Sequence, residues 1–207
     1  TFKGAVPGET SASELLELWG KPQEESNGDT TKILTFAIEP FSRVQAHLSD
    51  NVLNTIVVYL DVPGELAKIQ QQLDLAELRP APLRGNRGEI EGYLFPERGV
   101  SLIFTTDVEG AKVARIQLQS LSTDAFLLRV HGDGQFNWVK NLTDLDFAKT
   151  INPNDERIHW LKSEIFSQQF EYRQAALAIE RALMARPDSD LYQLAAANLI
   201  GKSGKYN

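Results

Sequence analysis

The chain has 207 residues, of which 42% are hydrophobic and 24% are charged, as is typical of a globular protein with one or two domains. Its net charge of −7 argues against nucleic acid or an anionic membrane surface as a partner, because both require a basic face. The absence of cysteine excludes disulfides, thiolate nucleophiles and cysteine-bound metals, and no apolar run approaches the ~20 residues of a membrane-spanning helix.

The sequence of residues 1–62 predicts one helix followed by three strands. Ser11 to Glu14 has the form of a capping box, and apolar residues then recur at helical spacing until Gly20 and Pro22 end the helix. Short turns separate the strand-like runs that follow, which predicts an antiparallel meander. These runs cover 32–38, 43–48 and 53–60.

Residues 63–122 repeat this order of elements. Pro63 opens a second helix, a loop rich in Pro and Gly covers 79–88, and strand-like runs follow at 89–95, 100–105 and 112–118. Pro40 and Pro96 lie 56 residues apart, and the same offset aligns Val44 with Val100. The sequence therefore predicts two α+β units, 1–62 and 63–122, each a helix with a three-stranded antiparallel meander.

Two segments resemble a known family. The run Leu18-Trp19-Gly20-Lys21-Pro22 after the capped helix, and the run from Tyr93 to Val100 in the second unit, are similar to the SmpA/BamE-type lipoproteins of outer-membrane assembly and the related β-lactamase-inhibitor-like fold. The resemblance implies the fold and an envelope scaffold, and it carries no functional residue. We therefore expect an exported or periplasmic protein, with the cytoplasm still open. The first residue is Thr1 rather than Met, which indicates a removed signal peptide or a trimmed N-terminus.

Residues 123–152 are predicted to form a connector with strand pieces. Within it, 126–130 has the composition of a strand, 131–134 that of a turn, and 137–150 that of irregular structure. Asp155 is a candidate helix N-cap, which places a boundary before a helical region at 153–207.

The helical region resembles one tetratricopeptide repeat followed by the start of another, truncated in its second copy. Phe170-Glu171-Tyr172 and Gly204-Lys205-Tyr206 mark equivalent turns 34 residues apart. Ala175 and Pro187 match family positions, whereas His159 and Lys162 depart from the Trp and Leu of the pattern. The resemblance implies a helical hairpin, a further helix and more repeats after Asn207. The alternative is an ordinary amphipathic helix pair. The predicted fold class is α+β, with this all-α region following the two meander units.

The repeat resemblance implies a partner-binding surface on the first helix of each copy. Trp160 matters most, because aromatic side chains with charged neighbours are typical of interface hot spots. The alternative is that Trp160 packs against the preceding domain. The predicted partner-binding residues are Arg157, Trp160, Glu164, Gln168 and Asn198. A separate cluster of Arg79, Arg84 and Arg87 is a candidate anion-binding loop, and its alternative is a solvated loop.

The sequence contains no recognisable catalytic or metal-binding motif. His47, His131 and His159 have no spacing typical of a zinc helix, and no nucleophile–base set or carboxylate pair can be proposed. We therefore expect no catalytic residue, metal or cofactor. The predicted function is a non-catalytic scaffold whose repeats bind a protein partner, with no nucleic acid. The alternative is a ligand- or glycan-binding module, an enzyme, or an enzyme inhibitor, with its site in the α+β half.

Overall fold

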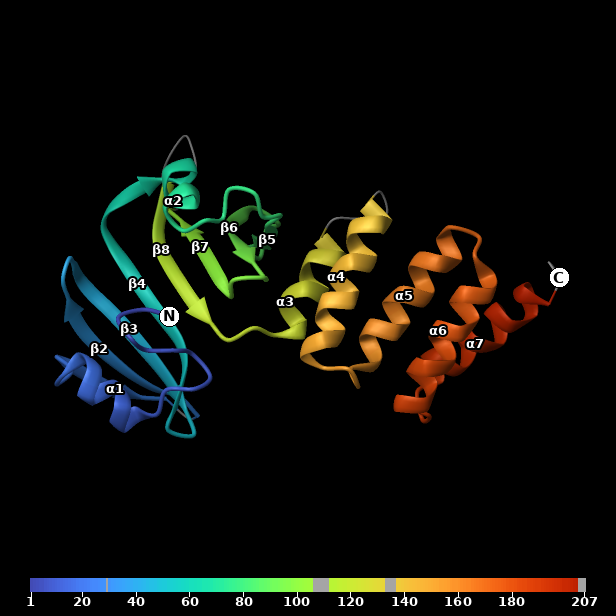
Figure 1. The fold of residues 1–207 in the computed structure, drawn as a ribbon, viewed down its shortest axis with the longest axis horizontal. Coiled ribbons are helices and arrows are strands. Elements are labelled where there is room, and N and C mark those ends of the chain that lie inside the picture. Colours follow the sequence, from blue (N-terminus) through green and yellow to red (C-terminus); the bar gives the residue numbers. More distant parts are fainter. Residues whose placement is uncertain (29, 106–111, 133–136, 205–207) are drawn as a thin grey trace. The chain divides into compact units, whose positions relative to one another are not determined.

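The structure, a computed structural model, describes residues 1–28, 30–105, 112–132 and 137–204. The chain divides into two compact units, Thr1–Leu121 and Ser122–Asn207 (Figure 1). The first unit is an antiparallel sheet with two helices, and the described part of the second consists of helices. We call them the sheet unit and the helical unit.

The sheet unit contains one sheet of eight described strands in the order β1-β2-β3-β4-β8-β7-β6-β5. All neighbouring strands are antiparallel. The strands are β1 (Glu24–Asn27), β2 (Lys32–Ile38), β3 (Phe41–Ser49), β4 (Val52–Glu65), β5 (Ala81–Arg84), β6 (Ile90–Phe95), β7 (Val100–Phe104) and β8 (Lys112–Gln119).

The prediction of two separate three-stranded units is wrong, because the two halves form one sheet. Helix α1 (Ala12–Trp19) precedes β1 to β4, helix α2 (Leu66–Gln72) precedes β5 to β8, and β4 pairs with β8 to join the halves. The missed strands, β1 and β5, lie at the two edges of the sheet. β1 is fully exposed and carries two glutamates, and β5 contains Pro82, so neither has the apolar alternation of an inner strand.

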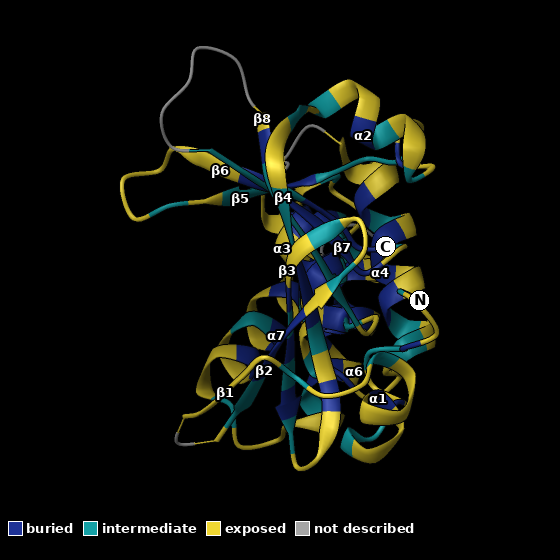
Figure 2. Cartoon of the chain, turned by 90° about the vertical axis from the view of Figure 1, so that its left-hand side faces the viewer, coloured by how far each residue is buried: buried dark blue, intermediate teal, exposed yellow. Residues whose placement is uncertain are grey.

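Both helices pack on the same face of this sheet. Leu15 of α1 shares a core with Val58, and Ile69 of α2 shares a core with Leu102. Ile116 lies beside both Val58 and Leu102 in the strand register, so these side chains point to one face. Figure 2 shows α1 and α2 on one side of the sheet. Neither described helix of the sheet unit therefore lies over the opposite face.

The helical unit has five helices in its described part, each packed against the next along the chain. They are α3 (Thr123–Gly132), α4 (Trp138–Ile151), α5 (Glu156–Gln168), α6 (Tyr172–Ala185) and α7 (Asp190–Ser203). One apolar cluster joins α3, α4 and α5, and a second joins α6 and α7 to α5 through Trp160. Every core in this unit is thus built between neighbouring helices.

The connector predicted at 123–152 is wrong, because helices α3 and α4 occupy it. The run 126–130 is apolar enough for a strand, but Phe126, Leu127 and Val130 are buried at the spacing of one helix face. In α4 the buried positions include the polar Asn141 and Asp144, so apolar periodicity alone does not reveal the helix. Part of the turn predicted at 131–134 lies outside the described residues.

Candidate binding groove of the helical unit

A groove of about 210 Å³ opens between α3, α4 and α5, inside the helical unit. Its lining combines apolar, aromatic and uncharged polar side chains with a single carboxylate. The lining residues are Val130, His131, Trp138, Asn141, Trp160, Leu161, Glu164, Ile165 and Gln168. We call this site the α3–α5 groove.

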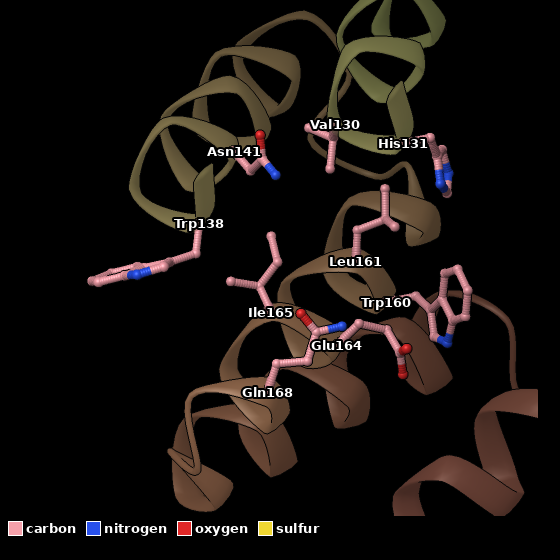
Figure 3. A pocket seen from close by; sticks show the side chains of 9 residues that line it. All are labelled: Val130, His131, Trp138, Asn141, Trp160, Leu161, Glu164, Ile165 and Gln168. Atoms are coloured by element: carbon pink, nitrogen blue, oxygen red, sulfur yellow. The ribbon is translucent and has the colours of Figure 1, made fainter. Parts of the chain in front are cut away.

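The α3–α5 groove has an apolar floor and a polar or aromatic rim (Figure 3). Ile165 points into the hollow, and Val130 and Leu161 face it from α3 and α5. These three side chains are buried. Trp138 and Trp160 stand on opposite sides of the opening, and Trp138 is 41% exposed. Such a site offers an apolar cavity of side-chain size with aromatic surfaces beside it.

The wall formed by α3 and α4 is held by a buried ion pair. Arg129 donates from Nε to Asp144 Oδ2 at 3.1 Å and from Nη2 to Oδ1 at 2.5 Å, and both residues are almost fully buried. Arg129 also lies over the ring of Phe126, with its Cζ 5.4 Å from the ring centroid. Two parallel charge-assisted hydrogen bonds set both distance and orientation. The pair therefore positions Val130, which follows Arg129, and Asn141, one turn before Asp144.

Helix α5 is fixed at its start by Asp155 and Arg157. Asp155 caps the helix by accepting a hydrogen bond from the backbone N–H of Arg157, and its carboxylate also accepts hydrogen bonds from the Arg157 guanidinium. The Arg157 side chain is the main cause that holds the pKa of Asp155 below its usual range. Arg157 also contacts Asp124 of α3 at 2.7 Å. These bonds set how α5 begins beside α3.

The structure brings three of the five predicted partner-binding residues together. Trp160, Glu164 and Gln168 lie at i, i+4 and i+8 of α5 and line the α3–α5 groove. Arg157 instead takes part in the ion pairs at the start of α5. Asn198 is exposed on α7 and does not line the groove.

Trp160 also helps to pack the helices of this unit together. Its ring is half-buried and packs against both apolar clusters of the helical unit, with its centroid 6.3 Å from that of Tyr192 on α7. The Trp160 ring therefore contributes to the packing between helices and also lines the groove. A variant at this position must be tested for folding as well as for binding.

The sequence did not reveal the second wall of the groove. Trp138 and Asn141 were assigned to an irregular connector, although a half-exposed Trp and a buried Asn three residues apart would suit one helix face over a cavity. The signal that could have found them is the helical recurrence of Asn141, Leu145 and Ala148, all buried on α4.

The predicted anion-binding loop lies at the β5–β6 hairpin. Arg84 ends β5 and donates from Nη1 to the carbonyl of Gly88 at 2.9 Å, which closes the hairpin. Arg87 lies in the turn, where its backbone N–H donates to Glu89, and Arg79 precedes β5. Arg84 thus has a local structural partner, and anion binding by the loop stays a prediction.

Comparisons with known proteins give no family. No family model matches the chain, and no curated protein matches it. Among solved structures, it is similar to an extracellular protein containing an SCP domain from Bacillus anthracis str. Ames, with 14% identity over 63% of this chain and 48% of that one, at a TM-score of 0.42. It is also similar to a cysteine-rich secretory protein from Staphylococcus aureus subsp. aureus Mu50, with 10% identity over 54% of this chain and 42% of that one, at a TM-score of 0.35.

The chain thus spans less than half the length of either protein. The resemblances to tetratricopeptide repeat proteins and to SmpA/BamE-type lipoproteins are overturned. No family model matches the chain, and the described strands of the first 121 residues form a single eight-stranded sheet rather than two separate meander units. A 34-residue spacing of aromatic turns in one helical segment was too short a pattern to identify a repeat family.

Among the residues that the structure describes, no helix is both long and apolar enough to cross a bilayer. No group of three or more His, Asp or Glu side chains there could hold a metal ion.

Proposed function

We propose that the protein is a non-catalytic interaction scaffold, and that its helical unit binds a peptide segment of a protein partner in the α3–α5 groove. The observation that carries the proposal is the groove itself: a buried apolar floor of Val130, Leu161 and Ile165 between two tryptophans and one carboxylate. Tryptophan beside a desolvated pocket is typical of the residues that dominate binding energy at protein interfaces.

The size of the groove favours a single side chain over a whole small molecule. Its volume of about 210 Å³ is below the range of about 300–1,000 Å³ common for small-molecule sites. A Leu or Phe side chain from a peptide would fill it and cover the buried floor. The rest of the peptide would then run over the rim, where Trp138 and Gln168 offer contact surface and hydrogen bonds.

The charge of the groove favours a basic residue next to that apolar anchor. Glu164 is exposed and is the one acidic residue in the lining, which includes no Lys or Arg. Trp160 lies one helical turn before it. A cationic side chain next to Glu164 and Trp160 would be stabilised by an ion pair with the carboxylate and by a cation–π interaction with the indole ring. We therefore propose that the bound segment carries an apolar side chain with a Lys or Arg beside it.

The test uses the full chain and terminally blocked pentapeptides measured by calorimetry. One peptide has a central Leu between two lysines, a second replaces Leu by Ser, and a third replaces the lysines by glutamates. We expect the first to bind about tenfold or more tightly than either of the others, because each change removes one of the two interactions. Equal binding of all three, or of none, would contradict the proposal.

Matched variants locate the binding on the chain. Trp138→Ala and Glu164→Gln should each weaken the first peptide, whereas Phe170→Ala and Glu180→Gln should not. Phe170 is 78% exposed in the turn after α5, and Glu180 is exposed on α6, so both lie outside the groove. Trp160→Ala should also weaken binding of the first peptide, and Trp160→Phe takes its place if the larger change unfolds the unit. Turnover of ester, phosphate or peptide substrates by the purified chain would overturn the non-catalytic assignment.

A further inference from the structure

The sheet face opposite α1 and α2 carries a line of polar side chains in the centre of the sheet. The register sets Arg43 of β3 beside Tyr59 of β4, because Val44 pairs with Val58, and it pairs Tyr59 with Arg115 of β8. The three residues therefore cross three adjacent strands at one level. They alternate with Val44, Val58 and Ile116, which point to the helix-covered core.

Tyr59 lies between two guanidinium groups. The Cζ of Arg43 is 4.5 Å from the ring centroid, and that of Arg115 is 5.9 Å away. Arginine stacked on an aromatic face keeps its hydrogen-bonding edge free while its planar surface is covered. Both guanidiniums thus lie within cation–π distance of the same ring.

The ring itself is held in place from the other side. Tyr59 Oη donates to Gln45 Oε1 at 2.9 Å, and Gln45 Nε2 donates to Thr35 Oγ1 at 3.5 Å. This chain of hydrogen bonds runs across β4, β3 and β2 on the same face. These hydrogen bonds restrain the hydroxyl end of Tyr59 on this face of the sheet.

Neither Arg43 nor Arg115 has a carboxylate partner among the residues that the structure describes. By contrast, Arg129, Arg157 and Arg186 each pair with an acid. Acids outnumber bases in residues 1–121, with 17 Asp and Glu against 11 Lys and Arg, a net charge of −6. A carboxylate ligand could therefore pair with Arg43 and Arg115 without displacing an ion pair of the described residues.

Three acids of the described sheet unit lie near this face, and two of them, Glu89 and Asp61, accept hydrogen bonds from other residues. Arg115 shares a hollow of about 420 Å³ with Glu89 and Glu91. The carboxylates of both glutamates lie against Gly85 in the β5–β6 turn, and Glu89 accepts the backbone N–H of Arg87. Asp61, two residues after Tyr59, accepts a hydrogen bond from Ser42.

From this arrangement we propose that the face around Arg43, Tyr59 and Arg115 is a second binding site, which takes an acidic segment of a protein partner in extended conformation. Alternate side chains of an extended segment point the same way about 7 Å apart, so acids at positions i and i+2 can reach guanidiniums on either side of one ring. Each guanidinium can receive a carboxylate through two parallel hydrogen bonds. A nucleic acid is disfavoured, because its backbone carries a long run of negative charge, whereas a short acidic segment brings only the few carboxylates that the two guanidiniums can pair with.

The test measures the full chain by fluorescence anisotropy with a labelled, terminally blocked peptide that has Glu at alternate positions and Thr between them. The same peptide with Gln in place of Glu is the first control. We expect binding of the Glu peptide only, weakened about three- to tenfold by Arg43→Gln and by Arg115→Gln, and weakened further by added salt. The affinity of Arg43→Lys for the Glu peptide should lie between those of the wild type and Arg43→Gln. Lys keeps the positive charge but cannot form the two parallel hydrogen bonds of a planar guanidinium.

Arg98→Gln is the matched control, because Arg98 is exposed in the β6–β7 turn and loses the same charge. Equal binding of the Gln peptide, or equal weakening by Arg98→Gln, would overturn the proposal. Tighter binding of a single-stranded oligonucleotide that competes with the peptide would also overturn it, in favour of a phosphate ligand. Glu164→Gln in the α3–α5 groove should leave binding of the Glu peptide unchanged. The proposal for the sheet face is therefore tested independently of the proposal for the groove.

Discussion

The two units are stabilised over different distances along the sequence. In the sheet unit, β4 pairs with β8, so residues near Val58 are held by residues near Ile116. In the helical unit each helix packs on its neighbour in the chain, and the apolar clusters follow that order. A sheet closed by its central pair should lose its structure as a whole, whereas a row of helices can lose one part and keep another.

The units also differ in charge and in what they present to a partner. The sheet unit has a net charge of −6, while the helical unit has 10 Lys and Arg against 11 Asp and Glu, a net charge of −1. The acidic unit nevertheless presents two arginines that have no carboxylate partner among the described residues, and the nearly neutral unit presents a groove with one acid at its rim. Local side-chain placement, rather than unit charge, therefore decides which ligand each site suits.

The largest expected effect is the loss of a buried aromatic side chain. Phe36→Ala in the sheet unit and Phe126→Ala in the helical unit should each cost about 3–5 kcal/mol, because both side chains are almost fully buried. Hydrogen exchange should then accelerate throughout the sheet for Phe36→Ala, but mainly in α3, α4 and α5 for Phe126→Ala. Phe170→Ala, at an exposed position, is the control. If Phe126→Ala accelerated hydrogen exchange in α7 as much as in α3, α4 and α5, the helical unit would unfold as a whole, like the sheet unit.

The next effect concerns the ion pair that holds α3 against α4. Asp144→Asn should destabilise the helical unit by about 3 kcal/mol, because it removes the negative charge that pairs with the buried Arg129 guanidinium. Replacing both partners, as in Arg129→Met with Asp144→Leu, should recover most of the loss. Asp146→Asn breaks an ion pair with Lys162 whose acid is 69% exposed, and should cost at most about 1 kcal/mol. Thermal unfolding of the four proteins measures this order.

A smaller effect compares helix caps in the two units. Ser11 forms a complete capping box with Glu14 before α1, whereas Ser189 caps α7 through a single hydrogen bond to the backbone N–H of Tyr192. Ser11→Ala should cost about 1 kcal/mol and Ser189→Ala less, because only the first removes a reciprocal pair. Denaturant titration of each variant provides the comparison, and a larger loss at Ser189 would reverse it.

The smallest effect is a pH dependence shared by both units. Burial lowers the pKa of His47 in the sheet unit and, together with nearby positive charges, that of His159 in the helical unit. A lowered pKa keeps the folded imidazole neutral while the unfolded one takes up a proton. Stability should therefore be fully present above about pH 6.5 and fall as the pH drops toward the lowered values.

His47 is the sharper case, because its Nε2 is buried with no hydrogen-bond partner in the described structure. His47→Gln should flatten the pH dependence of the sheet unit, and His159→Gln that of the helical unit. NMR titration of the imidazole signals gives the direction of each shift. Stability that rises as the pH falls from 7 to 5 would contradict the assignment.

The sequence predicted inner elements of the sheet well and its edges poorly. The expected runs at 32–38 and 100–105 nearly coincide with β2 and β7, because alternating apolar residues report a buried face. β1 and β5 carry no such alternation, and the pairing of β4 with β8 joins positions that no local pattern connects. The closure of two expected units into one sheet was therefore beyond a local analysis.

For the α3–α5 groove, too, the sequence revealed only what local spacing can show. Trp160, Glu164 and Gln168 share one helix face, so their proximity follows from sequence spacing alone. The opposite wall depends on α4, whose buried face includes Asn141 and Asp144 and was mistaken for irregular structure. Arg43 and Arg115 are 72 residues apart, and they meet only because both flank Tyr59 in the sheet register.

The most direct test of the central claim uses the three tryptophans of the full chain as reporters. Trp138 and Trp160 border the α3–α5 groove, whereas Trp19 lies in the sheet unit, where its Nε1–H donates to the carbonyl of Lys3 at 3.2 Å. In an NMR titration with the pentapeptide that carries Leu between two lysines, the indole N–H signals of Trp138 and Trp160 should shift and saturate while that of Trp19 stays in place. Unmoved signals from Trp138 and Trp160, or an equal shift of Trp19, would contradict a peptide-binding groove.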